Sequence, residues 1–581
     1  MKIHPNLRKT HLSSLLSIVK KQSITHMKNS ILSRVVPAVA LVAACTTFTA
    51  TAAAEKIKKE KLQIVFCFGQ SNMVGLAAVP TAWYMTQPQY VPPREATVLE
   101  TRYFDWNFYW SGARYYQGPK KQEVLDLVQA RRDSRMKWRQ RVRGANGVEW
   151  KKEWGEKPEP GRSNVYAFLD QKAEEEGIYK RIKDILDSKE NKFTCDDAYN
   201  ELILRDKVNA AAVKQANENY LKGATDADFD AFNAAVKEAK INPKDQGPDA
   251  EKNRAIYAGL AQKHLGLPIA KRTRIFGHGA IGGSEGTSGI DRSTQGPLSV
   301  GYGGDITTIG PEYGVGIALE RQVDAPILLV KCSWGNTSIA DAWRTPSLDG
   351  VETPIEKASR EAWNIKMGAI AKKAGNEYTP RPAPTKKGKL SWCWSQVLPQ
   401  VDKVLADPGK YYPDYDPKVG FEVAGLVWFQ GYSDKDNPAY GELFAQLIKD
   451  FRKKVKTPNM PVVCGTLGMA GFKAQAFTGG ANKGMLQASQ MPELAGTVDV
   501  VNTAPYFPME LDLLKQVMSS FEKGSPEYEK AAMVRSRATS NKGFHYHGSA
   551  KCFILMGDAM GRSLANLMAG GEPTINSAIK K

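Results

Sequence analysis

The sequence predicts an α/β fold in which a parallel β-sheet is covered by helices on both faces. Short apolar runs recur along the chain, and segments with the spacing of amphipathic helices lie between them. A strand buried on both faces gives a continuous apolar run, and parallel strands need crossover connections that are usually helical. At 581 residues, the chain is long enough for a large core and more than one structural unit.

Five apolar runs are predicted to be the strands of this sheet. They are Ile64–Phe68, Pro326–Lys331, Val423–Phe429, Pro461–Cys464 and Val498–Val501. Helical spacing or an acidic first turn predicts three helices within Asp226–Lys240, Leu443–Phe451 and Phe553–Leu567. The Gly- and Ser-rich segment Gly279–Gly304 is predicted to be a loop.

The first 54 residues have the features of a secretory signal peptide. Lys28 and Arg34 precede an apolar run that ends in three alanines at 52–54. A proline and several threonines interrupt the run, which argues against a permanent membrane span. In an alternative interpretation the run contains a bacterial lipobox, and Cys45 carries a lipid anchor. We therefore predict an exported protein, periplasmic or extracellular, and favour its soluble form over the lipid-anchored one.

Residues 97–272 interrupt the alternation of strands and helices. The region is charged, and half of the tryptophans of the chain lie between Trp83 and Trp154. We predict a mostly helical insertion here, which divides one sheet domain into residues 55–96 and 273–581. The insertion either shapes a substrate cleft or is a structural cap without chemistry.

The chain is strongly basic, with a formal net charge of +19. The first 54 residues hold seven Lys and Arg residues and no acid, so that subtracting them leaves +12. Much of this excess lies in Arg131–Arg143, beside Trp138. Basic residues with an aromatic are typical of nucleic-acid binding, but export argues against that partner. A solvated helix face is favoured, with attraction of an anionic polysaccharide as an alternative.

The cysteines predict neither a zinc site nor a dense disulfide framework. Cys67, Cys332 and Cys464 lie in apolar runs, where cysteine is usually a small buried hydrophobe. No CxxC motif and no close group of Cys and His residues occurs in the sequence. One or two disulfide bonds remain an alternative, and no metal or organic cofactor is expected.

The first predicted strand ends in the run Gly69-Gln70-Ser71-Asn72-Met73, which can begin a helix. Open α/β sheets bind their ligands at the carboxyl ends of the strands. A serine in that position can act as a nucleophile if a base reaches it. The alternative is a tight turn without chemistry.

A serine nucleophile needs a general base, and four histidines follow the signal segment. His545 and His547 directly precede the last predicted helix, in a loop that can reach back over the sheet edge. His264 lies in a helical stretch and is expected at the surface. His278 flanks the glycine-rich loop and can line a cleft.

Polar residues also follow two other predicted strands. Gly335 and Asn336 come after the second strand, where backbone N–H groups and an amide can hold an oxyanion. Gln430 and Asp434 come after the third strand, where they can orient a substrate or the histidine. Each segment alone is also compatible with a plain strand-to-helix turn.

These motifs together resemble the sialate O-acetylesterase and acetyl xylan esterase group of SGNH hydrolases. The resemblance rests on Gly69–Met73 and on Trp428, Gln430, Gly431 and Asp434, with support from Gly310–Gly314 and from Trp334, Gly335 and Thr337. The resemblance does not extend to the predicted insertion at residues 97–272. It implies a three-layer α/β/α, flavodoxin-like SGNH-hydrolase fold and a serine esterase that acts on acetylated carbohydrate without a cofactor.

The resemblance also implies roles for single residues. Ser71 matches the nucleophile, and its N–H and that of Gly335 match the oxyanion donors. His545 best matches the base, with His547 as the alternative. The residues expected to line the oxyanion and substrate site are Gln70, Asn72, Asn336 and Gln430.

Three departures from the family pattern leave the acid of the triad open. Lys542 and Phe544 stand where an aspartate would precede His545 or His547 by three residues. Tyr432 replaces a glutamate, and Asn336 replaces a glycine. Asp434 is our hypothesis for the acid, and a backbone carbonyl or a water molecule is the alternative.

The leading hypothesis is therefore an exported esterase that removes O-acetyl groups from a polysaccharide or sialic acid through an acetyl-enzyme. One rival is a glycan-binding pseudoenzyme of the same fold, which the missing acid favours. Another is an SGNH lipase or thioesterase, which would require a long apolar acyl groove.

Overall fold

The computed structural model describes residues 56–87, 90, 120–144, 148–160, 162–186, 224–243, 248–280, 293–373, 375–469, 480–508, 510–511, 514, 518, 521–541 and 543–574. The predicted signal peptide and its lipobox at Cys45 lie outside these residues. Within the described ranges, no helix combines the length and apolar character that a membrane span requires.

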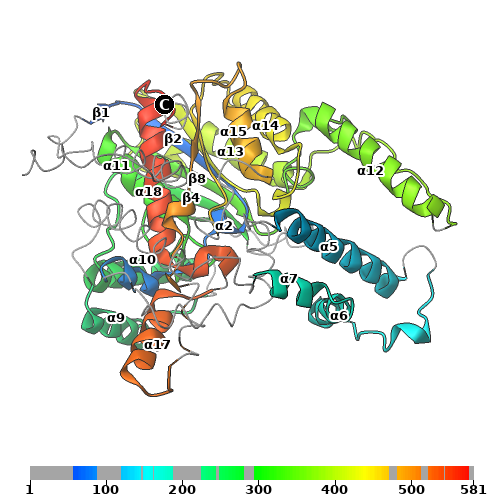
Figure 1. Ribbon diagram of the computed structural model, residues 1–581. Coiled ribbons are helices and arrows are strands. Elements are labelled where there is room, and N and C mark those ends of the chain that lie inside the picture. Colours follow the sequence, from blue (N-terminus) through cyan, green and yellow to red (C-terminus); the bar gives the residue numbers. More distant parts are fainter. Residues whose placement is uncertain are drawn as a thin grey trace, which may run out of the picture. The chain divides into compact units, whose positions relative to one another are not determined.

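A seven-stranded sheet forms the centre of the described chain, in the order β11-β10-β9-β2-β8-β4-β5 (Figure 1). All neighbouring strands are parallel except β4 and β5. The strands are β2 Leu62–Gly69, β4 Thr273–Ala280, β5 Thr294–Pro297, β8 Ile327–Trp334, β9 Phe421–Phe429, β10 Val462–Gly465 and β11 Val498–Val501. The mixed α/β class and all five predicted strands are thus confirmed.

The loop predicted for Gly279–Gly304 is wrong in part. β4 extends to Ala280, and Thr294–Pro297 forms the edge strand β5, which pairs antiparallel with β4. An edge strand has a sheet neighbour on one side only and needs no continuous apolar run. The sequence of β5, with Thr, Gln, Gly and Pro, therefore gave no strand signal.

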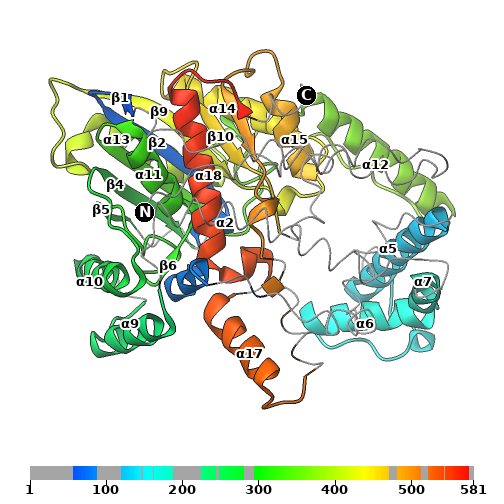
Figure 2. The same ribbon diagram turned by 60° about the vertical axis from the view of Figure 1, so that its left-hand side comes forward.

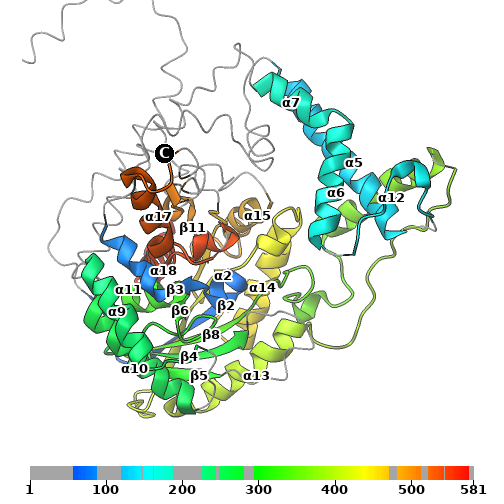
Figure 3. The same ribbon diagram turned by 90° about the horizontal axis from the view of Figure 1, so that it is seen from below.

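Two hydrophobic cores lie on the two faces of the sheet. Val65 and Cys67 of β2 belong to one core, and Ile64, Phe66 and Phe68 belong to the other. The first core contains residues of α11 Pro311–Gln322 and α18 Ala550–Met568. The second contains residues of α13 Trp392–Ala406, α14 Tyr440–Lys454 and α15 Gly480–Ser489. Figure 3 shows the strands between these two sets of helices.

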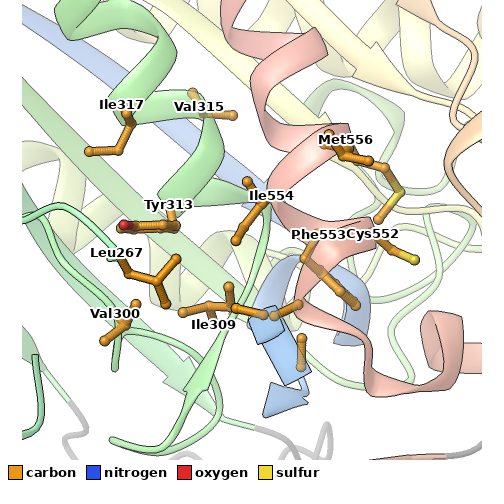
Figure 4. Close-up of a cluster of buried hydrophobic side chains, with 14 of the residues drawn as sticks. Leu267, Val300, Ile309, Tyr313, Val315, Ile317, Cys552, Phe553, Ile554 and Met556 are labelled. Carbon is orange, nitrogen blue, oxygen red and sulfur yellow. The ribbon is translucent and has the colours of Figure 1, made fainter. Parts of the chain in front are cut away.

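Helices α11 and α18 cross at glycines. A Cβ atom on Gly314 would overlap the carbonyl oxygen of Ile554, and one on Gly557 would overlap that of Pro311. The apolar side chains of α11 and α18 meet those of the loops before β4 and after β5 in the cluster shown in Figure 4. The helix predicted at the C-terminus is thus confirmed as α18, and the one at Leu443–Phe451 as α14.

The described part of residues 97–272 is helical. It contains α5 Lys121–Arg143, α6 Arg162–Glu175, α7 Ile178–Leu186, α9 Asp226–Glu238 and α10 Pro248–Leu265. The helix predicted at Asp226 is confirmed as α9, which a capping box at Thr225 begins. Helices α5, α6 and α7 have clusters of their own, whereas Phe232 and Tyr257 join the core that contains α11. A single insertion with the bounds 97–272 stays a prediction.

Five cysteines lie in the described residues, and all are buried free thiols. They are Cys67, Cys332, Cys393, Cys464 and Cys552. Burial raises the pKa of each thiol, to about 12 for Cys552. These thiols are therefore inert packing groups at neutral pH.

Candidate active site

Ser71 stands where the central strand β2 ends and the short helix α2 Ser71–Val74 begins. Gly69 makes this turn possible, because a Cβ atom there would overlap the carbonyl oxygen of Phe429 in β9. The N–H groups of Met73 and Val74 donate to the carbonyl of Gln70 and hold the turn closed. The strand-to-helix turn predicted for the serine is present, with Ser71 partly exposed. Figure 2 shows α2 beneath the sheet at the same end as the start of α18.

The sheet register brings the other predicted strand ends beside Ser71. Gly69 pairs with Ser333 of β8 on one side and with Phe429 of β9 on the other. Ser71, Gly335 and Gly431 each come two residues after these paired positions, so all three lie just beyond the same edge of the sheet. The oxyanion and substrate segments predicted from sequence are therefore neighbours of the serine in the fold.

Asn336 follows Gly335 in the left-handed backbone region, with φ +56°. Asparagine reaches this region more readily than other residues that carry a Cβ atom. The side chain is exposed, while Gly335 and Thr337 are buried on either side. Asn336 therefore makes a left-handed turn of the kind that glycine adopts readily.

A chain of buried amides and carboxylate connects the ends of β2, β8 and β9. The Gln430 side-chain NH2 donates to Gln70 Oε1 (3.1 Å), to the Thr337 carbonyl (2.9 Å) and to Asp434 Oδ2 (2.7 Å). Gln70 Oε1 also accepts from the Gly431 N–H. The predicted site residues Gln70, Gln430 and Asp434 are thus in direct contact, and they fix the Gly335–Thr337 turn beside the serine.

The contacts of Asp434 do not support its role as triad acid. It is 4% exposed, and Oδ2 accepts from the Ile339 N–H at 2.8 Å. Oδ1 lies within hydrogen-bond range of the Ala340 N–H (3.4 Å) and of the Asn437 amide (3.3 Å). No hydrogen bond among the described residues joins this carboxylate to a histidine. Its geometry is that of an anchor for residues 337–340.

Both candidate bases lie in η11 Gly543–Gly548, directly before α18. Tyr546, which separates the two histidines, has a left-handed backbone angle φ of +52°. His547 is also left-handed, with φ +57°. Such conformations cost about 1–3 kcal/mol each and persist where surrounding contacts fix them. Here Ser540 N and Asn541 N donate to the His547 carbonyl, and the Ser549 N–H donates to that of Tyr546.

Tyr546 attaches the histidine loop to the edge of the sheet. Its hydroxyl accepts from the Gly468 N–H at 2.9 Å and lies 3.0 Å from Thr503 Oγ1. These two residues follow β10 and β11. The neighbouring Met469 receives a long contact of 3.6 Å from the amide of Asn72, the residue after the serine. The histidine loop and the serine turn thus belong to the same edge of the sheet.

No hydrogen bond among the described residues joins Ser71 Oγ to either histidine. Catalytic hydrogen bonds are often long before substrate binds, so geometry of the free enzyme does not exclude a base. The ring of His547 packs against Phe507, with centroids 5.3 Å apart. Burial lowers the pKa of His545 to about 4, so its imidazole is neutral and able to accept a proton at pH 7.

Asn72 is 2% exposed, and its Oδ1 makes no hydrogen bond within the part of the chain that the structure describes. Buried polar atoms without partners are uncommon and often mark functional sites. Asn72 therefore stays a candidate for a residue that contacts substrate.

An ion pair that the sequence analysis missed lies behind the serine turn. Lys331 of β8 and Glu312 of α11 are both buried, with Nζ 2.9 Å from Oε2. Lys331 also donates to the carbonyl of Val74, the last residue of α2, at 2.9 Å, and to that of Tyr302 at 2.6 Å. Burial raises the pKa of Glu312 and lowers that of Lys331, and each charge opposes the shift of the other. The pair ties the end of α2 to α11.

The remaining histidines among the described residues are His278 and His264. His278 is in β4, where Nδ1 lies 3.2 Å from Ser293 Oγ and the ring contacts Trp334. His264 is partly exposed in the last turn of α10, as predicted. Lys542 lies outside the described residues. Among those residues, no three His, Cys, Asp or Glu side chains gather as metal ligands would.

Residues 413–505 match the family model for carbohydrate esterases described as sialic acid-specific acetylesterase. The matched segment includes β9, β10 and β11 with Gln430 and Asp434, but not Ser71, Gly335 or the histidines of η11. The match confirms the predicted resemblance. The similarity to these acetylesterases supports a carboxylic ester hydrolase.

Three solved structures are similar to parts of the chain. A protein from Arabidopsis thaliana has 14% identity over 47% of this chain and 80% of its own, with a TM-score of 0.23. A carbohydrate acetylesterase from Xanthomonas citri has 15% identity over 40% of this chain and 42% of its own, with a TM-score of 0.21. NanS has 13% identity over 40% of this chain and 68% of its own, with a TM-score of 0.23. No curated protein sequence matches the chain significantly.

Proposed function

We propose that this protein is an exported serine esterase of the SGNH type that removes O-acetyl groups from carbohydrate through an acetyl-enzyme. The observation that carries the proposal is the position of Ser71 just after β2, at the sheet edge where Gly335 and Gly431 follow the two neighbouring strands. The similarity of residues 413–505 to carbohydrate acetylesterases supports the substrate class.

In the proposed mechanism, His545 accepts the proton of Ser71 as the serine oxygen attacks the acetyl carbonyl. The N–H groups of Ser71 and Gly335 hold the oxyanion, and the sugar hydroxyl leaves with a proton from the histidine. Water, which loses its proton to the same histidine, then attacks the acetyl-enzyme, and the histidine returns that proton to the Ser71 oxygen as acetate leaves. Because burial keeps the His545 imidazole neutral at pH 7, this residue can begin the cycle as a base.

The decisive test is acetate release by the chain and by Ser71→Ala, measured on 4-nitrophenyl acetate and on acetylated polysaccharides. The substitution should abolish the acylation burst, because it removes the nucleophile. Ser536→Ala on the exposed face of α17 Pro526–Ala538 is a matched control and should retain full activity. Equal activity of Ser71→Ala and the parent protein would refute the mechanism.

Separate His545→Ala and His547→Ala variants assign the base. We expect a loss of at least about 10²-fold for His545→Ala, the size typical of a general base. His547→Ala should lose much less activity, since its ring packs on Phe507. The reverse order would make His547 the base, and two equally small losses would exclude both.

A glycan-binding protein without esterase activity is the second candidate. The observation that favours it is the engagement of both Asp434 oxygens with residues other than histidine. Glycan binding without Ser71-dependent acetate release would support this function instead.

A further inference from the structure

A pocket lies next to the turn that we assign to the oxyanion. It has a volume of about 510 Å³, within the range of ordinary ligand sites. The residues Asn336, Thr337 and Ser338 line it on one side, and segments 340–344, 349–356 and 384–392 complete it. Ser71, Gln70 and the histidines of η11 are not among its lining residues.

We propose that this pocket binds an uncharged sugar unit of the same glycan chain that carries the acetyl group. The proposal rests on the function proposed above and deepens it, because it makes an oligomeric or polymeric glycan the substrate rather than a free monosaccharide. The link is Asn336, which lines the pocket and directly follows the proposed oxyanion donor Gly335.

The walls of the pocket are fixed before any ligand binds. Arg344 uses all of its N–H groups, in a bidentate pair with Glu356 and in hydrogen bonds to the carbonyls of Ala340, Leu348 and Val351. Asp349 accepts from the N–H groups of Lys387 and Gly388, at 2.9 and 2.8 Å. These contacts join the three lining segments, and a preformed site lowers the entropy cost of binding.

The charges of the pocket do not suit an anion or a metal ion. The guanidinium of Arg344 is neutralised by Glu356, and Glu352 is paired with Arg360 through two contacts of 2.7 and 2.9 Å. The carboxylate of Asp349 is occupied by backbone N–H groups. Asp341 contributes one exposed carboxylate outside these pairs, and Lys387 and Lys389 contribute two exposed ammonium groups, so that the lining holds charges of both signs.

This lining suits an uncharged polyhydroxyl ligand. Sugar hydroxyl groups both donate and accept, so an isolated carboxylate and an isolated ammonium can each hydrogen-bond to them. Trp392 is partly exposed in the lining and is supported by the edge of Trp334, with ring centroids 5.3 Å apart. Its indole can cover the apolar C–H face of a sugar ring. An acyl chain, by contrast, would leave these charged groups without partners.

The test is the double variant Asp341→Ala/Lys387→Ala, with Asp414→Ala/Lys418→Ala as the matched exposed control. Substrates are 4-nitrophenyl acetate, O-acetylated N-acetylneuraminic acid and the uncharged polymers acetylated xylan, glucomannan and galactan. We expect KM for the preferred polymer to rise about tenfold with kcat unchanged, the mark of lost substrate binding. Hydrolysis of the two small esters should stay within about twofold of the parent protein.

Three outcomes would overturn the proposal. They are an equal loss on small and polymeric esters, no loss on the polymer, and no preference of the parent protein for any polymer over the acetylated monosaccharide. If no hydrolysis depends on Ser71, the proposed function fails on its own. Calorimetry with hexasaccharides from the three polymers then decides on the pocket: binding that the double variant weakens supports it, and unaffected or absent binding refutes it.

Discussion

Asn336 is a single residue whose conformation explains a departure from the family pattern. A glycine is expected there, and the backbone of Asn336 indeed has φ +56°. Since asparagine tolerates that region, the substitution leaves the turn intact and adds an exposed amide. The departure therefore does not argue against an oxyanion site at Gly335.

Substitution of Asp434 distinguishes a triad acid from an anchor for residues 337–340. Asp434→Asn should lower kcat by about 10- to 100-fold, because one donor–acceptor contact to the 337–340 backbone is lost and the oxyanion turn loosens. Loss of a true triad acid costs about 10⁴-fold. Steady-state kinetics with 4-nitrophenyl acetate measure the difference, and the exposed Asp436→Asn is the control. A 10⁴-fold loss would restore Asp434 as the acid.

His545 gives a prediction for the pH dependence. Burial lowers its pKa to about 4, whereas an ordinary histidine titrates near 6.5. The neutral base is therefore present above about pH 4, and kcat/KM should fall only as the pH drops through that value. Acetate release measured from pH 3 to 8 by a pH-stat checks this. A fall centred near pH 6.5 or above would mean that another base acts or that a carboxylate reaches His545 in the working enzyme.

At the scale of elements, Lys331 and Glu312 hold α2 against β8 and α11. Lys331→Met leaves the Glu312 carboxylate buried without its ion-pair partner. The substitution should therefore lower the free energy of unfolding by about 3–5 kcal/mol. Adding Glu312→Gln removes the stranded charge, so the double variant should regain most of the stability. The Val74 carbonyl still lacks its donor in both variants, and acylation of Ser71 should stay slow.

Denaturant unfolding and the acylation burst separate these two effects. If acylation recovers in step with stability in the double variant, the pair is only structural. If acylation remains slow in a stable double variant, the pair positions the nucleophile.

The crossing of α11 and α18 gives a second prediction for the elements. Gly557→Ala places a methyl group against the Pro311 carbonyl and should destabilise the protein by about 1–3 kcal/mol. Gly259→Ala in α10 is the matched control, because a Cβ atom there meets nothing within 4 Å. It should be neutral or stabilise by up to about 1 kcal/mol. Thermal unfolding of both variants measures the contrast, and equal Tm values would mean that the helices can move apart.

For the whole molecule, sequence reasoning succeeded where the signal was local and failed where it depended on distant contacts. The strand at Ile64–Phe68 is buried on both faces, so its apolar run was sufficient. The strand β4 was missed, because its residues include two glycines and a histidine and break the apolar run. Lys331 was read only as the end of a strand, since its partners Val74 and Glu312 are distant in the sequence.

The candidate site follows the same rule. Ser71, Gly335 and Gln430 each stand directly after a strand, and parallel strands bring their carboxyl ends together. Tyr546 had no such mark, because its role rests on its hydroxyl contacts with the loops after β10 and β11. Two consecutive left-handed residues at 546 and 547 also cannot be read from sequence.

The two cores on either side of the sheet predict that the described domain unfolds as one unit. Cys67 and Cys552 report on one core, and Cys332, Cys393 and Cys464 report on the other. Strands β2, β4, β8, β9 and β10 contribute side chains to both cores, so loss of one core should expose the other. Pulsed labelling with a thiol reagent across a urea series, read by peptide mass spectrometry, should modify all five thiols at one midpoint. Distinct midpoints for the two groups would instead show that the helical layers open separately, and the serine turn would then follow the layer of α11 and α18, whose core contains Met73.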